Sequence, residues 1–192
     1  MASAKVLDFS FMEIVDMRTE LQEKIDFARP PANPEDMIKK DDEERPARTV
    51  TANSLRLNNN AIEDLSQLTE GVESVLKNPM GLRWADLSGN EISEIPEGLG
   101  VFPDLNVLYL HGNKIESLKE LKKLAECTSL RSVTLHGNPL EDDQKWGHYY
   151  RLYLIHKMPN LTKIDFTGVT RQDRDTAKTW AQTHRKQLGK LL

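Results

Sequence analysis

The chain has 192 residues, of which 38% are hydrophobic and 29% are charged, and its net charge at pH 7 is −4. This length fits one domain. The negative net charge excludes an overall electrostatic field that would attract nucleic acid or an anionic membrane. A single cysteine, Cys127, excludes an internal disulfide and is typical of a reducing compartment, while the absence of a long apolar run or signal peptide predicts a cytoplasmic protein without a membrane partner.

The first 50 residues divide into an extension and a linker. Residues 1–29 contain a candidate helix at roughly 12–27, because Ile14, Met17, Leu21 and Ile25 recur at spacings of three and four. Residues 30–50 are rich in proline and then in mixed charge, which predicts a linker. The helix needs a docking surface, which is either its own domain or a partner.

Residues 51–140 contain four copies of one pattern, Leu-x-x-Leu-x-Leu-x-x-Asn-x-Ile, and Leu-His-Gly-Asn occurs in two of them. This is the leucine-rich repeat. In each copy the apolar residues of a short strand face the core, and the Asn amide satisfies backbone groups in the following loop. We therefore assign a structural ladder, without a ligand, to Asn60, Asn90, Asn113 and Asn138.

The pattern predicts an α/β fold, a leucine-rich repeat solenoid with a short curved parallel sheet and a helical or irregular convex side. Residues 64–77 carry a helical apolar stripe on this convex side, and a shorter helix lies around Leu118–Ala125. Cys127 follows that stripe, and we expect it to fill the core.

The remaining residues are expected to close the solenoid, because a terminal repeat exposes an apolar face. Residues 141–169 form a C-terminal cap, with an aromatic helix at 142–157 and a last strand at 159–166 that has Val169 at the Asn position. Residues 170–192 form a basic terminal helix and tail. Thr170 and Asp173 have the form of a capping box, and the helix is predicted to reach about residue 187. Six basic and two acidic residues give this segment a local charge of +4.

The residues between the core leucines face the concave side. Trp84, Val107 and Tyr109 form an exposed apolar and aromatic patch there, as in many binding hot spots. An alternative is that the N-terminal arm or the linker covers the patch. Arg56 and Asp86 are also predicted to be close enough to pair. The predicted partner-binding residues are Arg56, Trp84, Asp86, Val107, Tyr109, His111, Thr134 and His136.

The sequence offers little support for a metal site or a catalytic site. His111 and His136 are neighbours in one row, but Ser88 and Thr167 beside them are poor zinc ligands, so we predict no metal. A pH-sensitive contact is the alternative for this pair. Cys127 has no suitably spaced histidine, and the glycines at 98 and 100 do not form a phosphate loop. We predict no enzymatic activity, no cofactor and no small-molecule substrate.

The repeats resemble those of the phosphatase-1 regulatory leucine-rich repeat protein and axonemal dynein light chain 1. Over residues 50–182 they are more similar to the family of leucine-rich repeat-containing protein 51. The matching motifs are LNNN at 57–60, VLYLHGN at 107–113, LRSVTLHGNP at 130–139 and DFTGVTRQD at 165–173. The last motif lies outside the repeat consensus and is therefore the more specific.

This resemblance implies a small, cytoplasmic, non-enzymatic protein, and several such proteins are adaptors in the axoneme of motile cilia. The leading hypothesis is therefore an adaptor or structural component of the ciliary axoneme that binds a protein partner on its concave face. A regulatory subunit of a cytosolic phosphatase is an alternative that uses the same face. Microtubule binding through the basic C-terminal tail is a second alternative.

Overall fold

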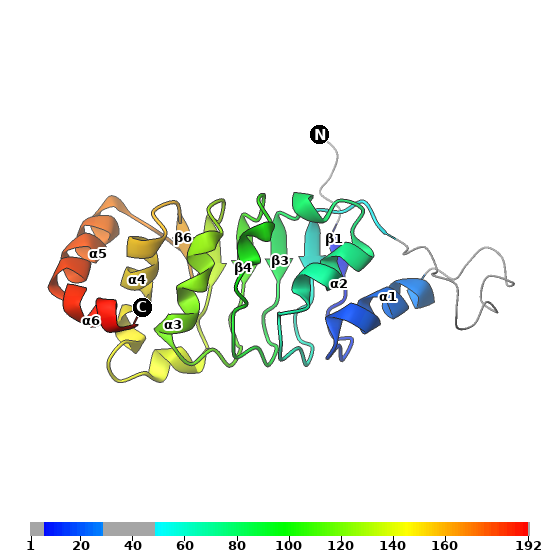
Figure 1. Ribbon diagram of the computed structural model, residues 1–192, viewed down its shortest axis with the longest axis horizontal. Helices are drawn as coiled ribbons and strands as arrows, with labels where there is room; N and C mark the ends of the chain where they lie inside the picture. The colour runs from blue at the N-terminus through cyan, green and yellow to red at the C-terminus, as the bar shows by residue number, and fades with distance from the viewer. Residues whose placement is uncertain (1–5, 29–48, 192) are drawn as a thin grey trace, which may run out of the picture.

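The computed structural model describes residues 6–28 and 49–191, which form an elongated solenoid around one sheet (Figure 1). The strands follow one another across the sheet in chain order, and each of the first five is parallel to the next. They are β1 (Val6–Asp8), β2 (Ser54–Arg56), β3 (Trp84–Asp86), β4 (Val107–Tyr109), β5 (Ser132–Thr134) and β6 (Lys163–Ile164). A short β7 (Thr167–Gly168) pairs antiparallel with β6. The predicted α/β leucine-rich repeat solenoid is confirmed.

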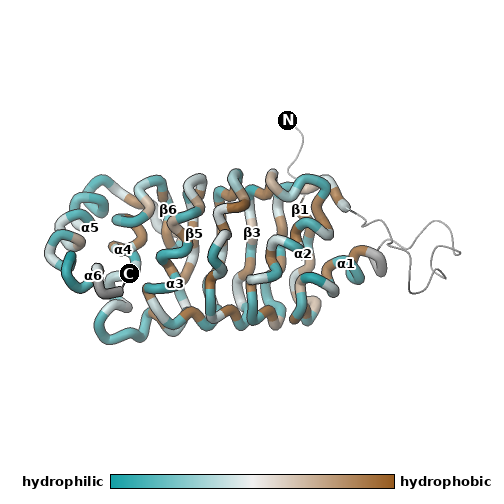
Figure 2. The backbone as a smooth tube through the Cα atoms, viewed as in Figure 1, coloured by the Kyte–Doolittle hydropathy of each residue, from teal (hydrophilic) through white to brown (hydrophobic). Residues whose placement is uncertain are grey.

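The core lies between the sheet and the convex side, and the repeat consensus fills it. Leu87, Leu110 and Leu135 are almost completely buried at equivalent positions of successive repeats. Side chains alternate along each strand, so that Ala85 is buried between the partly exposed Trp84 and Asp86. Hydrophobic positions recur from turn to turn of the chain (Figure 2).

Two helices and several 3-10 turns form the convex side of the repeats. α2 (Leu68–Val75) buries one apolar stripe and is shorter than the predicted 64–77. α3 (Leu118–Leu121) continues into a 3-10 turn at Lys123–Glu126, and further turns lie at Pro79–Gly81 and Leu99–Val101. Cys127 is buried as expected, and burial followed by the negative charge of Glu126 raises the pKa of its thiol to about 11.

The N-terminal region contains a degenerate repeat that the sequence analysis did not predict. β1 extends the sheet, and segment 7–14 has the same spacing as 55–62, but Met12 stands where the consensus has Asn. Ile14 is completely buried as a repeat residue and lies outside the helix, so α1 (Met17–Ala28) begins later than predicted. Phe11 has the left-handed backbone, φ 57°, that Asn59 has in the next repeat, φ 55°.

Helix α1 packs against α2 on its own solenoid (Figure 1). Met17, Leu21 and Ile25 are buried, and a Cβ atom at Gly71 of α2 would lie only 3.0 Å from the Cβ atom of Met17. The apolar face of α1 is therefore used within the molecule and is not available to a partner. The predicted linker, residues 30–50, lies almost entirely outside the described residues.

Helices cap the C-terminal end. Two 3-10 turns, Pro139–Asp142 and Gly147–Tyr149, precede α4 (Tyr150–Lys157), which packs against α5 (Arg171–Thr183). The predicted capping box of Thr170 and Asp173 is confirmed at the start of α5. The predicted single terminal helix is interrupted at His184, and α6 (Arg185–Leu191) follows. Of the helices in the described ranges, none has the length and apolar character needed to cross a membrane.

Candidate protein-binding face

A band of aromatic side chains crosses the concave surface. It consists of Trp84, Tyr109, His111, His136 and Phe166, and we call it the aromatic strip. Trp84 and Tyr109 meet edge to face with their ring centroids 5.6 Å apart, and Tyr109 meets Phe166 in the same way, also at 5.6 Å. Edge-to-face contacts of this kind stabilise aromatic pairs beyond the burial of their area. The strip therefore has a defined arrangement that does not depend on a bound partner.

Phe166 is the strip residue that the sequence analysis missed. The repeat spacing places it at a core leucine position, but its side chain is 52% exposed. The predicted last strand ends early, at Ile164, and a two-residue hairpin turn of Asp165 and Phe166 leads into β7. Both turn residues have left-handed backbones, with φ of 48° and 61°. This turn rotates Phe166 out of the core and onto Tyr109 and the histidines.

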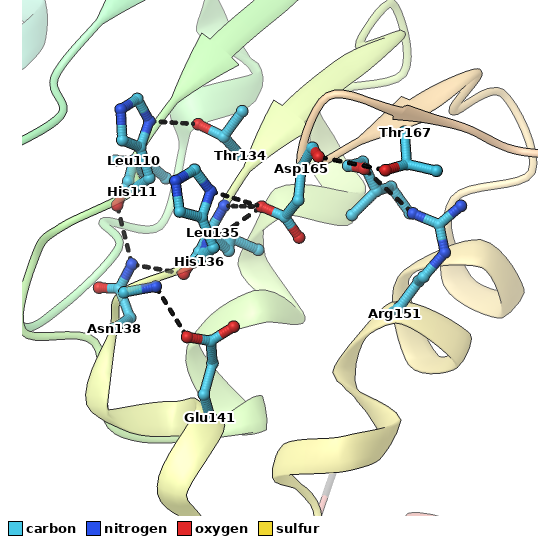
Figure 3. A network of polar contacts seen from close by, with 12 residues as sticks. Leu110, His111, Thr134, Leu135, His136, Asn138, Glu141, Arg151, Asp165 and Thr167 are labelled. Atoms are coloured by element: carbon cyan, nitrogen blue, oxygen red, sulfur yellow. Dashed lines mark hydrogen bonds and ion pairs between the residues drawn. The ribbon is translucent and has the colours of Figure 1, made fainter.

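A residue without glycine's freedom costs about 1 kcal/mol or more in this backbone region. The cap offsets that cost by holding the turn at several points. Tyr150 donates a hydrogen bond to Asp165 Oδ2 at 2.7 Å, and Arg151 donates to the carbonyls of Ile164 and Gly168, on either side of the turn. Asp165 Oδ1 accepts the backbone N–H groups of Leu135 at 2.6 Å and His136 at 3.0 Å (Figure 3).

At the other end of the strip, a charged pair lies beside Trp84. The Arg56 guanidinium lies 5.5 Å from the centroid of a Trp84 ring, and it donates a hydrogen bond to Asp8 Oδ2 at 3.0 Å. The suggested pairing of Arg56 with Asp86 is therefore wrong, because β1 supplies a nearer carboxylate. Asp86 instead accepts hydrogen bonds from the backbone and the hydroxyl of Ser88.

Two other predicted contact residues have different environments. Val107 is partly exposed next to Trp84, in register with it across β3 and β4. Thr134 is completely buried, with 0% of its surface exposed, and its hydroxyl lies 2.8 Å from His111 Nδ1. Thr134 therefore supports His111 and does not offer a contact to a partner, which corrects its prediction as a binding residue.

The two histidines of the strip form a stacked pair. Their ring centroids are 4.7 Å apart with an angle of 10° between the planes, and His136 Nδ1 lies 3.4 Å from Asp165 Oδ1 (Figure 3). Burial, followed by electrostatic repulsion from the His136 ring beside it, lowers the pKa of His111. No group of three or more potential metal ligands occurs in the described parts of the chain.

The lowered pKa of His111 predicts a pH-dependent stability. The unfolded chain takes up this proton first, so the free energy of unfolding decreases as the pH falls through the unfolded value of about 6.5 towards the lower folded value. His111→Gln is expected to lose less stability than the wild type between about pH 7.5 and pH 5.5. Urea unfolding at both pH values measures this. Both proteins should still lose some stability, because burial and Lys157 also lower the pKa of His156. Equal losses in the two proteins would contradict the prediction.

The Asn residues form a continuous hydrogen-bonded row below the concave surface. Asn113 is typical, because its amide donates to the carbonyls of Leu87 and Leu110 at 2.9 and 3.0 Å, and its Oδ1 accepts the N–H of Ile92 at 3.1 Å. Corresponding bonds are made by Asn60, Asn90 and Asn138. Each side chain thus joins its own loop to the preceding repeat.

Comparison with known proteins agrees with this architecture. A family model described as "Leucine-rich repeat" matches residues 80–191. Leucine-rich repeat-containing protein 51 of Bos taurus is 45% identical over 133 residues, which are 69% of this chain and 67% of that protein. The protein of the same name from Homo sapiens is 44% identical over the same shares.

A solved structure shows the same fold. A chain in the crystal structure of the Drosophila melanogaster SNF/U2A′ complex aligns with a TM-score of 0.63 and 22% identity, covering 97% of this chain and 87% of that one. Together with the matching family model and the curated relatives, the repeat geometry shows that the chain belongs to the leucine-rich repeat family and, within it, to the family of leucine-rich repeat-containing protein 51.

Proposed function

We propose that the chain is a non-enzymatic adaptor that binds a protein partner on its concave face. The observation that carries this proposal is the aromatic strip. Large aromatic side chains dominate the affinity of many interfaces, and here they are already fixed against one another before a partner arrives. The N-terminal helix does not compete for this face, because α1 packs on α2 (Figure 1).

The relatives and the fold are consistent with this role. Leucine-rich repeats stack into curved surfaces that bind other proteins. The solved structure of the same fold is a complex of U2A′ with SNF, so a solenoid of this shape can assemble with a protein partner. The shared fold supports protein binding by this chain as an analogy.

The proposed setting is the cytoplasm and, within it, the axoneme of motile cilia or flagella. This part of the proposal is supported by the similarity of the repeats to those of axonemal light chain 1. A stable axonemal assembly would suit a fixed, partly apolar surface. A regulatory subunit of a cytosolic phosphatase would use the same concave residues, so the identity of the co-purified protein separates the two.

The double substitution Trp84→Ala and Tyr109→Ala tests the binding face. We expect it to abolish co-purification with axonemal proteins from ciliated cells, because removing central interface aromatics costs several kcal/mol of binding, at least about 2 for each hot-spot residue. The circular dichroism melt should change little, since both side chains are partly exposed.

Phe11→Ala provides a matched control. Phe11 is 73% exposed and lies in the degenerate N-terminal repeat, outside the aromatic strip. The Phe11→Ala variant should co-purify with the same proteins as the wild type. Retention of all partners by the double variant would exclude the concave face as the binding site. A phosphatase catalytic subunit as the specifically lost protein would keep the face and replace the axonemal setting.

A further inference from the structure

Two aspartates on the concave surface have the same local structure but differ in the partner of their second carboxylate oxygen. Asp8 and Asp86 each precede a serine by two residues, and in both cases Oδ1 accepts the backbone N–H and the hydroxyl of that serine. The second oxygen of Asp8, Oδ2, accepts a hydrogen bond from Arg56 at 3.0 Å. Among the described residues, Asp86 Oδ2 has neither a hydrogen-bond partner nor an ion pair.

The aromatic surroundings of the two carboxylates are also alike. The Arg56 guanidinium that binds Asp8 lies over Trp84, so the chain itself forms a combination of carboxylate, guanidinium and aromatic ring. One strand further on, Asp86 is in register with Tyr109, whose ring meets both Trp84 and Phe166 edge to face. Asp86 and Tyr109 thus supply the carboxylate and the aromatic ring of the same combination.

We propose, building on the proposed concave binding face, that the partner segment presents an arginine that pairs with Asp86 Oδ2 and stacks on Tyr109. A guanidinium fits both requirements, because it is planar, binds carboxylates in a directed way and stacks on aromatic faces. An ammonium group lacks the planar face, so arginine is preferred over lysine at this position. Arg56 does not serve Asp86, since it is bound to Asp8 and lies over Trp84.

Partial exposure makes this position useful for selecting a partner. Asp86 is partly buried, with Trp84 two residues before it on β3 and Tyr109 in register on β4, and a charge pair there is screened less than on an open surface. A partner that placed an acidic or apolar group there would leave the carboxylate without a counter-charge. The pair therefore sets which segment binds, while Trp84, Tyr109 and Phe166 supply apolar contact area.

Selection from a random peptide library displayed on phage, with the full chain as bait, tests the inference. The wild type is expected to enrich peptides that contain arginine, and these peptides should bind the Trp84→Ala/Tyr109→Ala variant poorly. For an enriched peptide, Asp86→Asn should weaken binding roughly ten-fold or more, as expected when one partner of a partly buried charge pair is removed. Asp175→Asn, which changes an exposed carboxylate on α5, is the matched control and should bind as the wild type does.

The outcomes separate this inference from the proposed function. Enriched peptides that need Trp84 and Tyr109 but show no preference for arginine would overturn the inference and leave the binding face intact. An equal preference for lysine, or an arginine preference that persists in Asp86→Asn, would overturn it as well. Peptides that bind the double aromatic variant as well as the wild type would contradict the proposed binding face itself.

Discussion

Asn113→Ala is expected to lower the free energy of unfolding by about 3 kcal/mol or more. The side chain of Asn113 is buried, and it binds four backbone groups, the carbonyls of Leu87, Leu110 and, at a longer distance, His111, and the N–H of Ile92. Each group left without a partner in the interior costs about 1–3 kcal/mol, and a water molecule admitted to the space would recover part of this. Urea unfolding followed by circular dichroism measures the change.

Asn106→Ala is the control for that experiment. Asn106 is exposed and donates one hydrogen bond, to the carbonyl of Ser129 at 3.0 Å, so its loss should change stability by less than about 1 kcal/mol. Both variants should have the same dependence on urea concentration as the wild type. Overlapping transitions for Asn113→Ala and Asn106→Ala would show that the Asn row contributes little to stability.

The repeats were predictable because each copy specifies its own strand and loop. Leu108, Leu110 and Asn113 have fixed spacings, and the same spacings elsewhere produce the same buried positions and hydrogen bonds. Gly112 carries the left-handed backbone, φ 66°, that the turn before Asn requires. Local rules and the global fold agree over this part of the chain, which is why sequence reasoning succeeds there.

The degenerate N-terminal repeat escaped prediction for a physical reason. In the intact repeats an Asn marks the turn, but Met12 cannot provide its hydrogen bonds. The loop is still tied to the next repeat in the same way as the others, because Asn60 Oδ1 accepts the N–H groups of Met12 and Ile14 and its amide donates to the carbonyl of Phe9. A strand whose polar groups are satisfied by its neighbour carries a weak signal in its own sequence.

The proposed binding face was only partly predictable. Strand alternation placed Trp84 and Tyr109 on the surface, and no change of register intervenes. Phe166 fits the consensus of the core, and only the hydrogen bonds of Asp165 to Leu135, directly after β5, and to Tyr150 of α4 show that the strand stops before it. Thr134 alternates correctly but is covered by its neighbours. Contacts between distant segments decide both cases, and no local pattern encodes them.

The C-terminal cap therefore has two tasks. It closes the hydrophobic core, with Trp146 and Trp180 in edge-to-face contact, and it fixes the hairpin turn that carries Phe166. Strained backbone at a surface turn persists only where surrounding contacts hold it, and such strain gathers at binding sites. The sequence motif at 165–173 that resembles the family beyond its repeats includes this turn, so the cap supports one end of the proposed binding face.

Asp165→Ala is expected to damage stability and partner binding together. The substitution removes the acceptor of the Leu135 and His136 N–H groups and of the Tyr150 hydroxyl. Because these three hydrogen bonds are only partly buried, their loss should cost about 2–4 kcal/mol of folding free energy. It also frees Phe166 from its position on Tyr109, so co-purification of the partner should fall. The measurements are urea unfolding and quantitative co-purification on the same variant.

Two further variants separate the parts of this effect. Asp165→Asn retains a carbonyl oxygen for the backbone N–H groups, and asparagine tolerates the left-handed region, so it should restore most of the stability. Phe166→Gly relieves backbone strain, because glycine adopts φ 61° without cost, so it should weaken binding while changing stability by less than about 1 kcal/mol. If Phe166→Gly binds partners as the wild type does, the turn serves only to close the sheet; if Asp165→Asn is as unstable as Asp165→Ala, the charge of the carboxylate and not its hydrogen bonds holds the turn.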